Sequence, residues 1–162
     1  MLMLTKRPQL INKLCPLRSQ RIWHGVTAET QAWLDLRWPI LRDVDSEVYW
    51  LSVEPMMGAM TLPQSFLDLG QRAWCIVGGE SGPRARPMHP EWARAIVNQC
   101  QNASVPVFVK QILERGRRVP MEQWPEDLRV REFPLVHTWT SGVQSPDGQE
   151  AASSQKSMEG LW

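Results

Sequence analysis

The sequence predicts an α/β fold, a partial (βα) barrel of about five mostly parallel strands with helices on the outside. Short apolar runs alternate with helical patterns along the chain, which is typical of right-handed βαβ units. The runs are almost continuously apolar, as in strands that are covered on both faces. The 162 residues are enough for one domain with one core. We expect the partial barrel at residues 1–134 and a flexible tail at residues 135–162.

Five apolar runs are the candidate strands, and several are rich in β-branched or aromatic residues. They are Met1–Leu4, Ile22–Val26, Val48–Val53, Trp74–Val77 and Val105–Val109. Short βαβ connections place consecutive strands side by side. We therefore expect the strand order 1-2-3-4-5, with the helices on one outer face of the sheet.

Four helical patterns lie between these strands. The first, Pro8–Ser19, opens with a proline, which is favoured at the first position of a helix. The second is Thr30–Leu41, and we expect Pro39 to break or end it. The third is the short segment Pro63–Leu69. The fourth, Pro90–Ala103, has the clearest spacing of apolar residues along one helix face.

The last part of the chain is less regular. Residues 114–134 are basic and then rich in turn-forming residues, and we expect a loop followed by a short extended stretch. From Ser141 the residues are small and polar. Such a segment buries too little apolar surface to offset the entropy cost of ordering, so we expect a disordered tail.

Composition excludes several classes of protein. Hydrophobic residues make up 43% and the formal charge is +1, so no broad electrostatic surface for nucleic acid is expected. A basic run, Arg115, Arg117 and Arg118, is the one feature that favours nucleic-acid binding, and such runs are usually solvated loops. No apolar run reaches the roughly 18–20 residues of a membrane span, and the apolar start is too short for a signal peptide. We expect a soluble, cytoplasmic protein.

The cysteines do not form a metal-binding pattern. Cys15, Cys75 and Cys100 are far apart and belong to no CxxC motif. A zinc or iron–sulfur site that depends on clustered cysteines is therefore not expected, and we predict no metal in this chain. The odd number of cysteines suits a reducing compartment.

Polar residues follow every predicted strand. In parallel α/β sheets the carboxyl ends of the strands carry the ligand site, so these residues should meet on one rim. A buried strand that ends in a carboxylate, as at Glu54, needs a partner or a function. Pairing of the charges across the rim for stability alone is the open alternative. The candidate ligand-binding residues at the strand ends are Lys6, Glu29, Ser52, Glu54, Gly78, Gly79, Glu80 and Lys110.

The loop after the fourth strand, GGESGPRARPMHP, adds further candidates. Its glycines allow a ligand to approach the backbone closely. Arg84 and Arg86 are suited to grip a phosphate or carboxylate, and His89 precedes the next helix. Alternatively, the arginines are solvated or pair with Glu80. We expect Glu54 and Glu80 to reach one common space and to share one ligand. Because two carboxylates this close repel each other, at least one of them needs a cation, for which Lys110 and Lys6 are the candidates. No residue is assigned a catalytic role.

Seven segments together resemble a known family. They are LTKRPQ, IWHGVTAETQ, RWPILR, YWLSVEPMMG, IVGGESGPRARPMHPEWAR, VPVFVKQ and PEDLRVREFP, which cover Leu4–Pro134. They resemble the phage and prophage family of uncharacterised proteins often titled gene product thirty-seven / sixty-eight. That resemblance implies a (βα) barrel similar to radical S-adenosylmethionine enzymes, with an iron–sulfur cluster in full-length relatives. After Gln111 this chain has Ile112 and Leu113, where the family commonly continues with Trp-Gly.

The resemblance implies two functions from different classes. In the first, the chain is the carboxyl-terminal half of a radical S-adenosylmethionine-like protein, which binds a nucleotide-like ligand but is not catalytic alone. Because this chain lacks the cysteine motif, the resemblance implies S-adenosylmethionine cleavage and an iron–sulfur cluster for full-length relatives only. No cofactor is expected in this chain. In the second, it is a degenerate or accessory phage interaction protein. We expect the first strand to leave an open sheet edge, and side chains such as Trp50 that line the barrel interior to meet water. Both features predict self-association or binding of a missing amino-terminal half.

Overall fold

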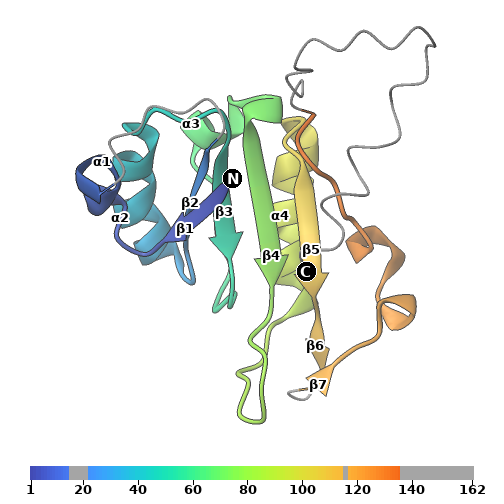
Figure 1. Cartoon of the computed structure of the whole chain (residues 1–162). Helices are drawn as coiled ribbons and strands as arrows, with labels where there is room; N and C mark the ends of the chain where they lie inside the picture. The colour runs from blue at the N-terminus through green and yellow to red at the C-terminus, as the bar shows by residue number, and fades with distance from the viewer. Residues whose placement is uncertain (15–21, 115–116, 136–162) are drawn as a thin grey trace, which may run out of the picture.

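The computed structural model describes residues 1–14, 22–114 and 117–135 (Figure 1). Its strands are β1 (Leu2–Thr5), β2 (Trp23–Thr27), β3 (Tyr49–Val53), β4 (Ala73–Gly78) and β5 (Val107–Gln111). They form one sheet in the order β1-β2-β3-β4-β5, and all neighbouring pairs are parallel. The predicted α/β class and strand order are confirmed. Among the described strands the sheet is open, and its closure into a barrel stays a prediction. From residue 136 onward the predicted tail lies outside the described residues.

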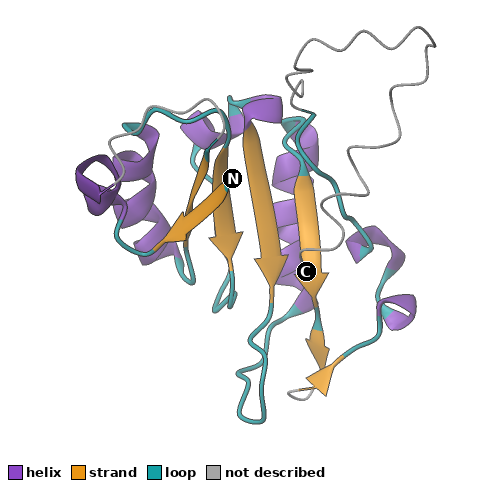
Figure 2. Ribbon diagram, viewed as in Figure 1, coloured by secondary structure: helices purple, strands orange, loops and turns teal. Residues whose placement is uncertain are grey.

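The helices lie where the sequence predicts them (Figure 2). A 3-10 turn, η1 (Pro8–Leu10), leads into α1 (Ile11–Leu14), and the rest of the predicted first helix falls outside the described residues. The longer helices are α2 (Gln31–Arg42) and α4 (Pro90–Asn102). Between β3 and β4 lie the short α3 (Gln64–Leu67) and the turn η2 (Gly70–Arg72).

The prediction that Pro39 breaks or ends the second helix is wrong. Helix α2 begins after Thr30, whose side chain accepts a hydrogen bond from the Trp33 backbone, and it continues through Pro39 to Arg42. A proline inside a helix costs about 3 kcal/mol. Trp38 and Leu41, on either side of the proline, are 2% and 0% exposed. Burial of side chains of this size contributes about 1.5–3 kcal/mol each, which offsets the cost of the proline.

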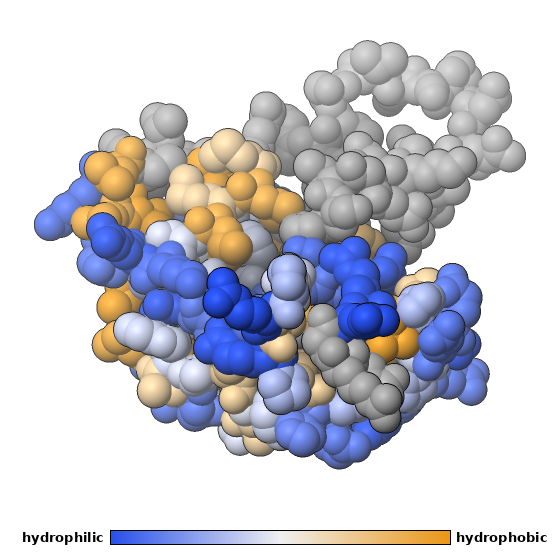
Figure 3. Space-filling view, turned by 90° about the horizontal axis from the view of Figure 1, so that it is seen from below, coloured by the Kyte–Doolittle hydropathy of each residue, from blue (hydrophilic) through white to orange (hydrophobic). Residues whose placement is uncertain are grey.

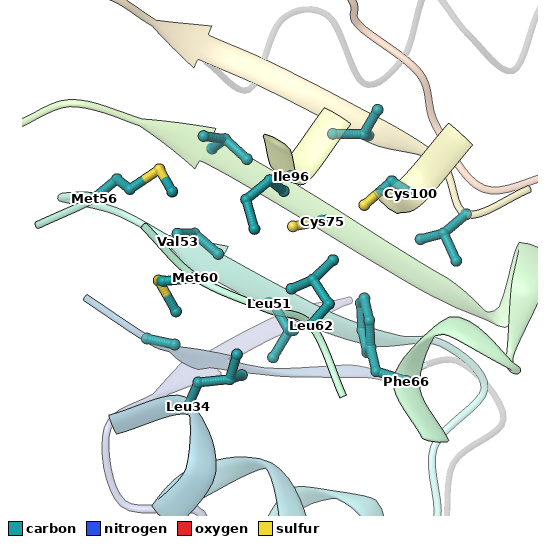
Figure 4. Close-up of a cluster of buried hydrophobic side chains, with 14 of the residues drawn as sticks. Leu34, Leu51, Val53, Met56, Met60, Leu62, Phe66, Cys75, Ile96 and Cys100 are labelled. Atoms are coloured by element: carbon teal, nitrogen blue, oxygen red, sulfur yellow. The ribbon is translucent and has the colours of Figure 1, made fainter. Parts of the chain in front are cut away.

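The helices cover one face of the sheet, as predicted. Alternate strand residues such as Leu51, Val53 and Cys75 pack against Leu34 of α2 and Ile96 of α4 (Figure 4). All of these side chains are fully buried. Residues of all four described helices belong to this cluster, so this face of the sheet packs against a single helical layer.

The opposite face of the sheet carries an aromatic cluster. Trp74 lies at its centre, with ring centroids 6.3 Å from Trp23, 6.0 Å from Trp50 and 5.4 Å from Phe133. We predicted that side chains such as Trp50 meet water on this face, and this is wrong, because Trp50 is 3% exposed. Its indole lies against β2, where a Cβ at Gly25 would collide with the ring. The packing of the rings on one another removes them from solvent.

The two edges of the sheet differ. After β5 the chain continues through β6 (Leu113–Glu114), β7 (Arg117–Arg118), η3 (Met121–Gln123) and η4 (Glu126–Leu128). It then returns along β5 in an antiparallel direction, so the predicted extended stretch is confirmed. The segment predicted as a loop differs, because it contains the short antiparallel pair of β6 and β7 and two 3-10 turns. The Val109 amide donates to the Val130 carbonyl, and the Glu132 amide donates to the Val107 carbonyl, both at 2.9 Å.

Strand β1 forms the other edge. Within the described residues it pairs with β2 alone. Among the described helices, none is both long and apolar enough to cross a membrane.

Candidate functional site

The carboxyl ends of the five strands form one rim (Figures 1 and 3). Seen end-on, strongly hydrophilic residues gather across its centre (Figure 3). Backbone hydrogen bonds join the loops that follow neighbouring strands. The Met57 amide donates to the Glu29 carbonyl at 3.0 Å, and the Met56 amide donates to the Gly78 carbonyl at 2.9 Å. The Gly79 amide donates to the Gln111 carbonyl at 3.2 Å. The side chains of the rim are thus presented on an ordered backbone.

Glu54 is one of the two most buried carboxylates of this rim, with 16% exposure against 15% for Glu29. The Ser52 hydroxyl donates to Glu54 Oε2 at 3.4 Å, and Lys110 Nζ lies 3.7 Å from the same oxygen. The other oxygen lies over Gly78, where an added Cβ would be only 2.5 Å from Glu54 Oε1. The absence of a side chain at Gly78 therefore makes room for the carboxylate. Ser52, Glu54, Gly78 and Lys110, all predicted site residues, are brought together here.

Burial raises the pKa of the Glu54 carboxyl above its ordinary value, although Lys110 and Ser52 oppose the shift. The net direction means that Lys110 and Ser52 do not fully compensate for the loss of water around the charge. A carboxylate in this situation gains from any further cation or hydrogen-bond donor that a ligand brings. This is the electrostatic property expected of a binding group.

Gln111 and Arg118, which were not among the predicted site residues, support this site. The Gln111 side-chain amide donates to the Gly79 carbonyl at 2.5 Å, and its oxygen accepts from Arg118 Nη2 at 2.5 Å. Gln111 is 5% exposed. Gly79 itself is tightly packed, since a Cβ there would collide with Leu113 Cδ1. Gly79, a predicted site residue, is therefore fixed by packing and by Gln111. The sequence signal was the polar Lys110-Gln111 pair at the end of an apolar strand.

Glu29 has its own cations. Its carboxylate lies 2.5 Å from Lys6 Nζ and 2.7 Å from Arg37 Nη1, which also donates to the Thr27 carbonyl at 2.6 Å. Burial alone would raise the pKa of Glu29, but the hydrogen bonds from Lys6 and Arg37 bring it below its ordinary value. The structure thus places Lys6 beside Glu29. Arg37 was also missed, although it interrupts the apolar stripe formed by Leu34 and Trp38 of the same helix.

Glu80 is held by its own loop. Arg86 donates to it through Nε at 2.7 Å, through Nη2 at 2.8 Å and through its backbone amide at 2.9 Å. These hydrogen bonds lower the pKa of Glu80 to about 2. This is the pairing that the sequence left open as the alternative for the loop. We expected at least one of Glu54 and Glu80 to take Lys110 or Lys6 as its cation. Lys110 does pair with Glu54, whereas Glu80 takes Arg86.

The remaining candidates of this loop are exposed. Arg84 has no ion-pair or hydrogen-bond partner among the described residues. His89 lies directly before α4, and its ring centroid is 4.7 Å from that of Trp92. His24 is different, because it is buried and its backbone amide donates to the Ser46 hydroxyl at 3.1 Å. Burial lowers the pKa of His24, against the opposing charge of Asp45, which fits a structural role.

The described residues do not fit an iron–sulfur cluster. Within ranges 1–14, 22–114 and 117–135, no three His, Cys, Asp or Glu side chains are grouped so that they could hold a metal ion. Cys75 and Cys100 are buried in the helix-facing core, away from solvent (Figure 4). A hydrogen bond with Cys100 and burial raise the pKa of the Cys75 thiol, which disfavours the thiolate that binds iron. Cys15 lies outside the described residues.

A family model described as "Protein of unknown function (DUF5131)" matches residues 1–151. No curated protein and no solved structure matches the chain.

Proposed function

Because the chain belongs to DUF5131, a family of proteins of unknown function, we propose its function from the rim. The chain is a ligand-binding module, the carboxyl-terminal half of a phage-type radical S-adenosylmethionine-like protein, and is not catalytic alone. The observation that carries the proposal is the Glu54–Lys110 pair, which joins the end of β3 to β5 across the intervening strand β4. It combines a largely buried carboxylate of raised pKa with an ammonium at 3.7 Å.

The chemistry of this pair suits a small zwitterion. An acid and a base side by side complement a ligand that carries an ammonium and a carboxylate. S-adenosylmethionine has both groups at its amino-acid end and a nucleoside at the other. In this proposal Glu54 accepts from the ligand ammonium, while Lys110 turns to the ligand carboxylate. Ser52 and Gly78 hold the Glu54 carboxylate in place, so that little ordering is needed when the ligand binds.

A second candidate function is an accessory phage interaction protein without catalysis. The observation that favours it is the β1 edge, which has no strand partner on its outer side among the described residues. Leu4 of this strand is 46% exposed. In that case a protein partner, and not a small ligand, would be the physiological binding target.

Calorimetric titration of S-adenosylmethionine and of adenosine tests the ligand-binding proposal. We expect Glu54→Gln to weaken S-adenosylmethionine binding by roughly 10- to 100-fold, because a hydrogen bond to a charged group contributes about 1.5–3 kcal/mol. The melting temperature should be unchanged or slightly higher, since the glutamine carries no buried charge. Glu126→Gln, an exposed carboxylate of η4, is the matched control. A lower melting temperature together with unchanged binding would reject the site.

The same proposal predicts that the chain holds no cluster of its own. After anaerobic reconstitution with iron and sulfide, we expect neither bound iron nor acid-labile sulfide, because three clustered thiolates are needed. Stoichiometric iron with a cluster absorbance band would contradict this prediction. This measurement needs no ligand. It therefore tests, independently of the rim, whether the iron–sulfur cluster belongs to another part of the proposed full-length protein.

A further inference from the structure

The loop between β4 and α4 contains a carboxylate clamped by a single arginine. Three donors of Arg86, its backbone amide, Nε and Nη2, converge on the two oxygens of Glu80 at 2.7–2.9 Å. Bidentate contact of this kind is how arginine recognises carboxylates and phosphates. Both side chains remain in contact with water, with 30% exposure for Glu80 and 57% for Arg86. The interaction is therefore accessible to a competing anion.

The same loop holds more positive than negative charge. Arg84 is exposed and has no partner among the described residues, so the segment from Glu80 to Arg86 has two guanidinium groups and one carboxylate. Gly82, at φ +119°, and the bond from the Ala85 amide to the Gly82 carbonyl at 3.1 Å turn the loop back on itself. The turn keeps Arg84 and Arg86 on one short segment. Helix α4 begins only four residues after Arg86, and the start of a helix also favours anions.

We propose that Glu80 is an internal stand-in for a phosphate group, and that Arg84 and Arg86 form a phosphate subsite on the rim. The proposal rests on the proposed function only in placing the subsite on the same ligand-binding rim. The ligand class that this subsite selects is a phosphorylated nucleotide, distinct from S-adenosylmethionine, which has no phosphate. In the free chain Glu80 occupies Arg86. When the ligand binds, its phosphate displaces Glu80 and engages both arginines.

A phosphate is favoured over a carboxylate ligand for a physical reason. Glu80 belongs to the same loop as Arg86, so it competes at a high effective concentration. A ligand carboxylate offers the same single charge and gains nothing in return for this disadvantage. A phosphate has more charge and a third oxygen, and it can therefore contact Arg84, which Glu80 leaves without a partner among the described residues.

Titration of the intact chain with pyrophosphate at low ionic strength tests the proposal. We expect Glu80→Gln to bind pyrophosphate roughly tenfold more tightly than the wild type, because the subsite is no longer occupied by the internal carboxylate. Glu126→Gln changes the net charge by the same amount on the outer surface and should leave the affinity nearly unchanged. An equal gain in both variants, or no gain in Glu80→Gln, would overturn the proposal.

Arg84→Gln provides a second test that leaves the Glu80–Arg86 pair intact. We expect this variant to bind pyrophosphate more weakly than the wild type, and the double variant Glu80→Gln/Arg84→Gln to lose most of the gain. The proposal would also be overturned if Arg84→Gln left the affinity for pyrophosphate unchanged and the double variant kept the affinity of Glu80→Gln. S-adenosylmethionine has no phosphate, so its titration tests the Glu54 site separately. S-adenosylmethionine binding that depends on Glu54, combined with pyrophosphate binding indifferent to Glu80 and Arg84, would reject the phosphate subsite alone.

Discussion

Glu54 and Glu80 follow adjacent strands of one sheet, yet their surroundings have opposite effects on them. Glu54 is largely buried and lies 3.7 Å from Lys110, and burial raises the pKa of its carboxyl. Glu80 lies in an exposed loop where three donors of Arg86 contact it, and those hydrogen bonds lower its pKa to about 2. Position at the end of a strand does not decide the role of a carboxylate. Its burial and the geometry of its cation do.

The difference assigns different roles to the two carboxylates: Glu54 is suited to bind a ligand, and Glu80 holds its own loop together. The Glu54 carboxylate is undercompensated and gains from a ligand that supplies donors. The Glu80 carboxylate is already satisfied, so a ligand can only replace it. Glu29, held by Lys6 and Arg37, resembles Glu80 in the direction of its pKa but is buried as deeply as Glu54. Glu54 is therefore the carboxylate of the rim whose surroundings favour direct contact with a ligand.

Among the substitutions that test this comparison, Gly78→Ala should have the largest effect on ligand binding. The new Cβ would lie 2.5 Å from Glu54 Oε1 and 3.3 Å from its Cδ, so the carboxylate must leave its present position. The end of a glutamate side chain can shift, and the stability change should stay within about 1 kcal/mol. We expect S-adenosylmethionine binding to fall at least as far as in Glu54→Gln.

Gly58→Ala is the matched control for this substitution. Gly58 lies in the loop after β3, and a Cβ there would meet no atom within 4 Å. We expect unchanged binding and a stability equal to or slightly above that of the wild type. Equal losses of binding in Gly78→Ala and Gly58→Ala would show that rim loops in general, and not the place of Glu54, control the affinity.

The pH dependence of stability should differ in sign between the two carboxylates. The folded chain holds the Glu54 proton more tightly than the unfolded chain, whose glutamate pKa is 4.5. The free energy of unfolding therefore falls as the pH rises from 4.5 through the raised pKa, by about 1.4 kcal/mol for each unit between the two values. Denaturation of the wild type and of Glu54→Gln over this window should show the slope in the wild type alone.

Glu80 should contribute the opposite, smaller slope. Its folded pKa of about 2 lies below the ordinary value of 4.5, so its contribution is present above pH 4.5 and is lost as the pH falls toward 2. The pair is exposed, and salt should screen this contribution. Comparison of the wild type with Glu80→Gln at low and high salt checks it. A slope that survives high salt would contradict our description of an exposed pair.

The smallest expected effect concerns the β1 edge. We expect the chain to self-associate through this strand at micromolar concentration, and Leu4→Lys to reduce that association, because charges on an edge oppose strand pairing. Leu4 is 46% exposed, so the folded monomer should tolerate the lysine. Light scattering over a concentration series measures the effect. A monomeric mass for the wild type at every concentration, together with no binding of hydrophobic dyes, would contradict the expectation.

The sheet was predictable from the sequence because buried parallel strands leave near-continuous apolar runs, as in residues 73–78. Strand order followed from the short connections. Two features were not predictable. Pro39 lies inside α2 because burial of Trp38 and Leu41 outweighs a local preference. Trp50 is buried because its ring lies against Gly25 and packs with Trp74, which are distant in sequence.

The candidate site was predictable in part for a similar reason. The ends of the strands identified Glu29, Glu54 and Glu80, since parallel strands deliver their polar ends to one edge. Which cation each carboxylate takes was not predictable, because Arg37 and Arg86 reach Glu29 and Glu80 through a helix face and a loop turn. The pKa directions depend on those partners and on burial, which only the folded chain defines.

Carbon-13 NMR of the glutamate side-chain carboxyls, with Glu54→Gln and Glu80→Gln to assign the signals, tests the central claim most directly. For the free chain we predict that Glu54 titrates above 4.5 and Glu80 near 2. Saturating S-adenosylmethionine should lower the pKa of Glu54, because the ligand brings cationic groups to the carboxylate, and should leave Glu80 in place. A Glu54 midpoint at or below 4.5 that does not respond to the ligand would contradict the account.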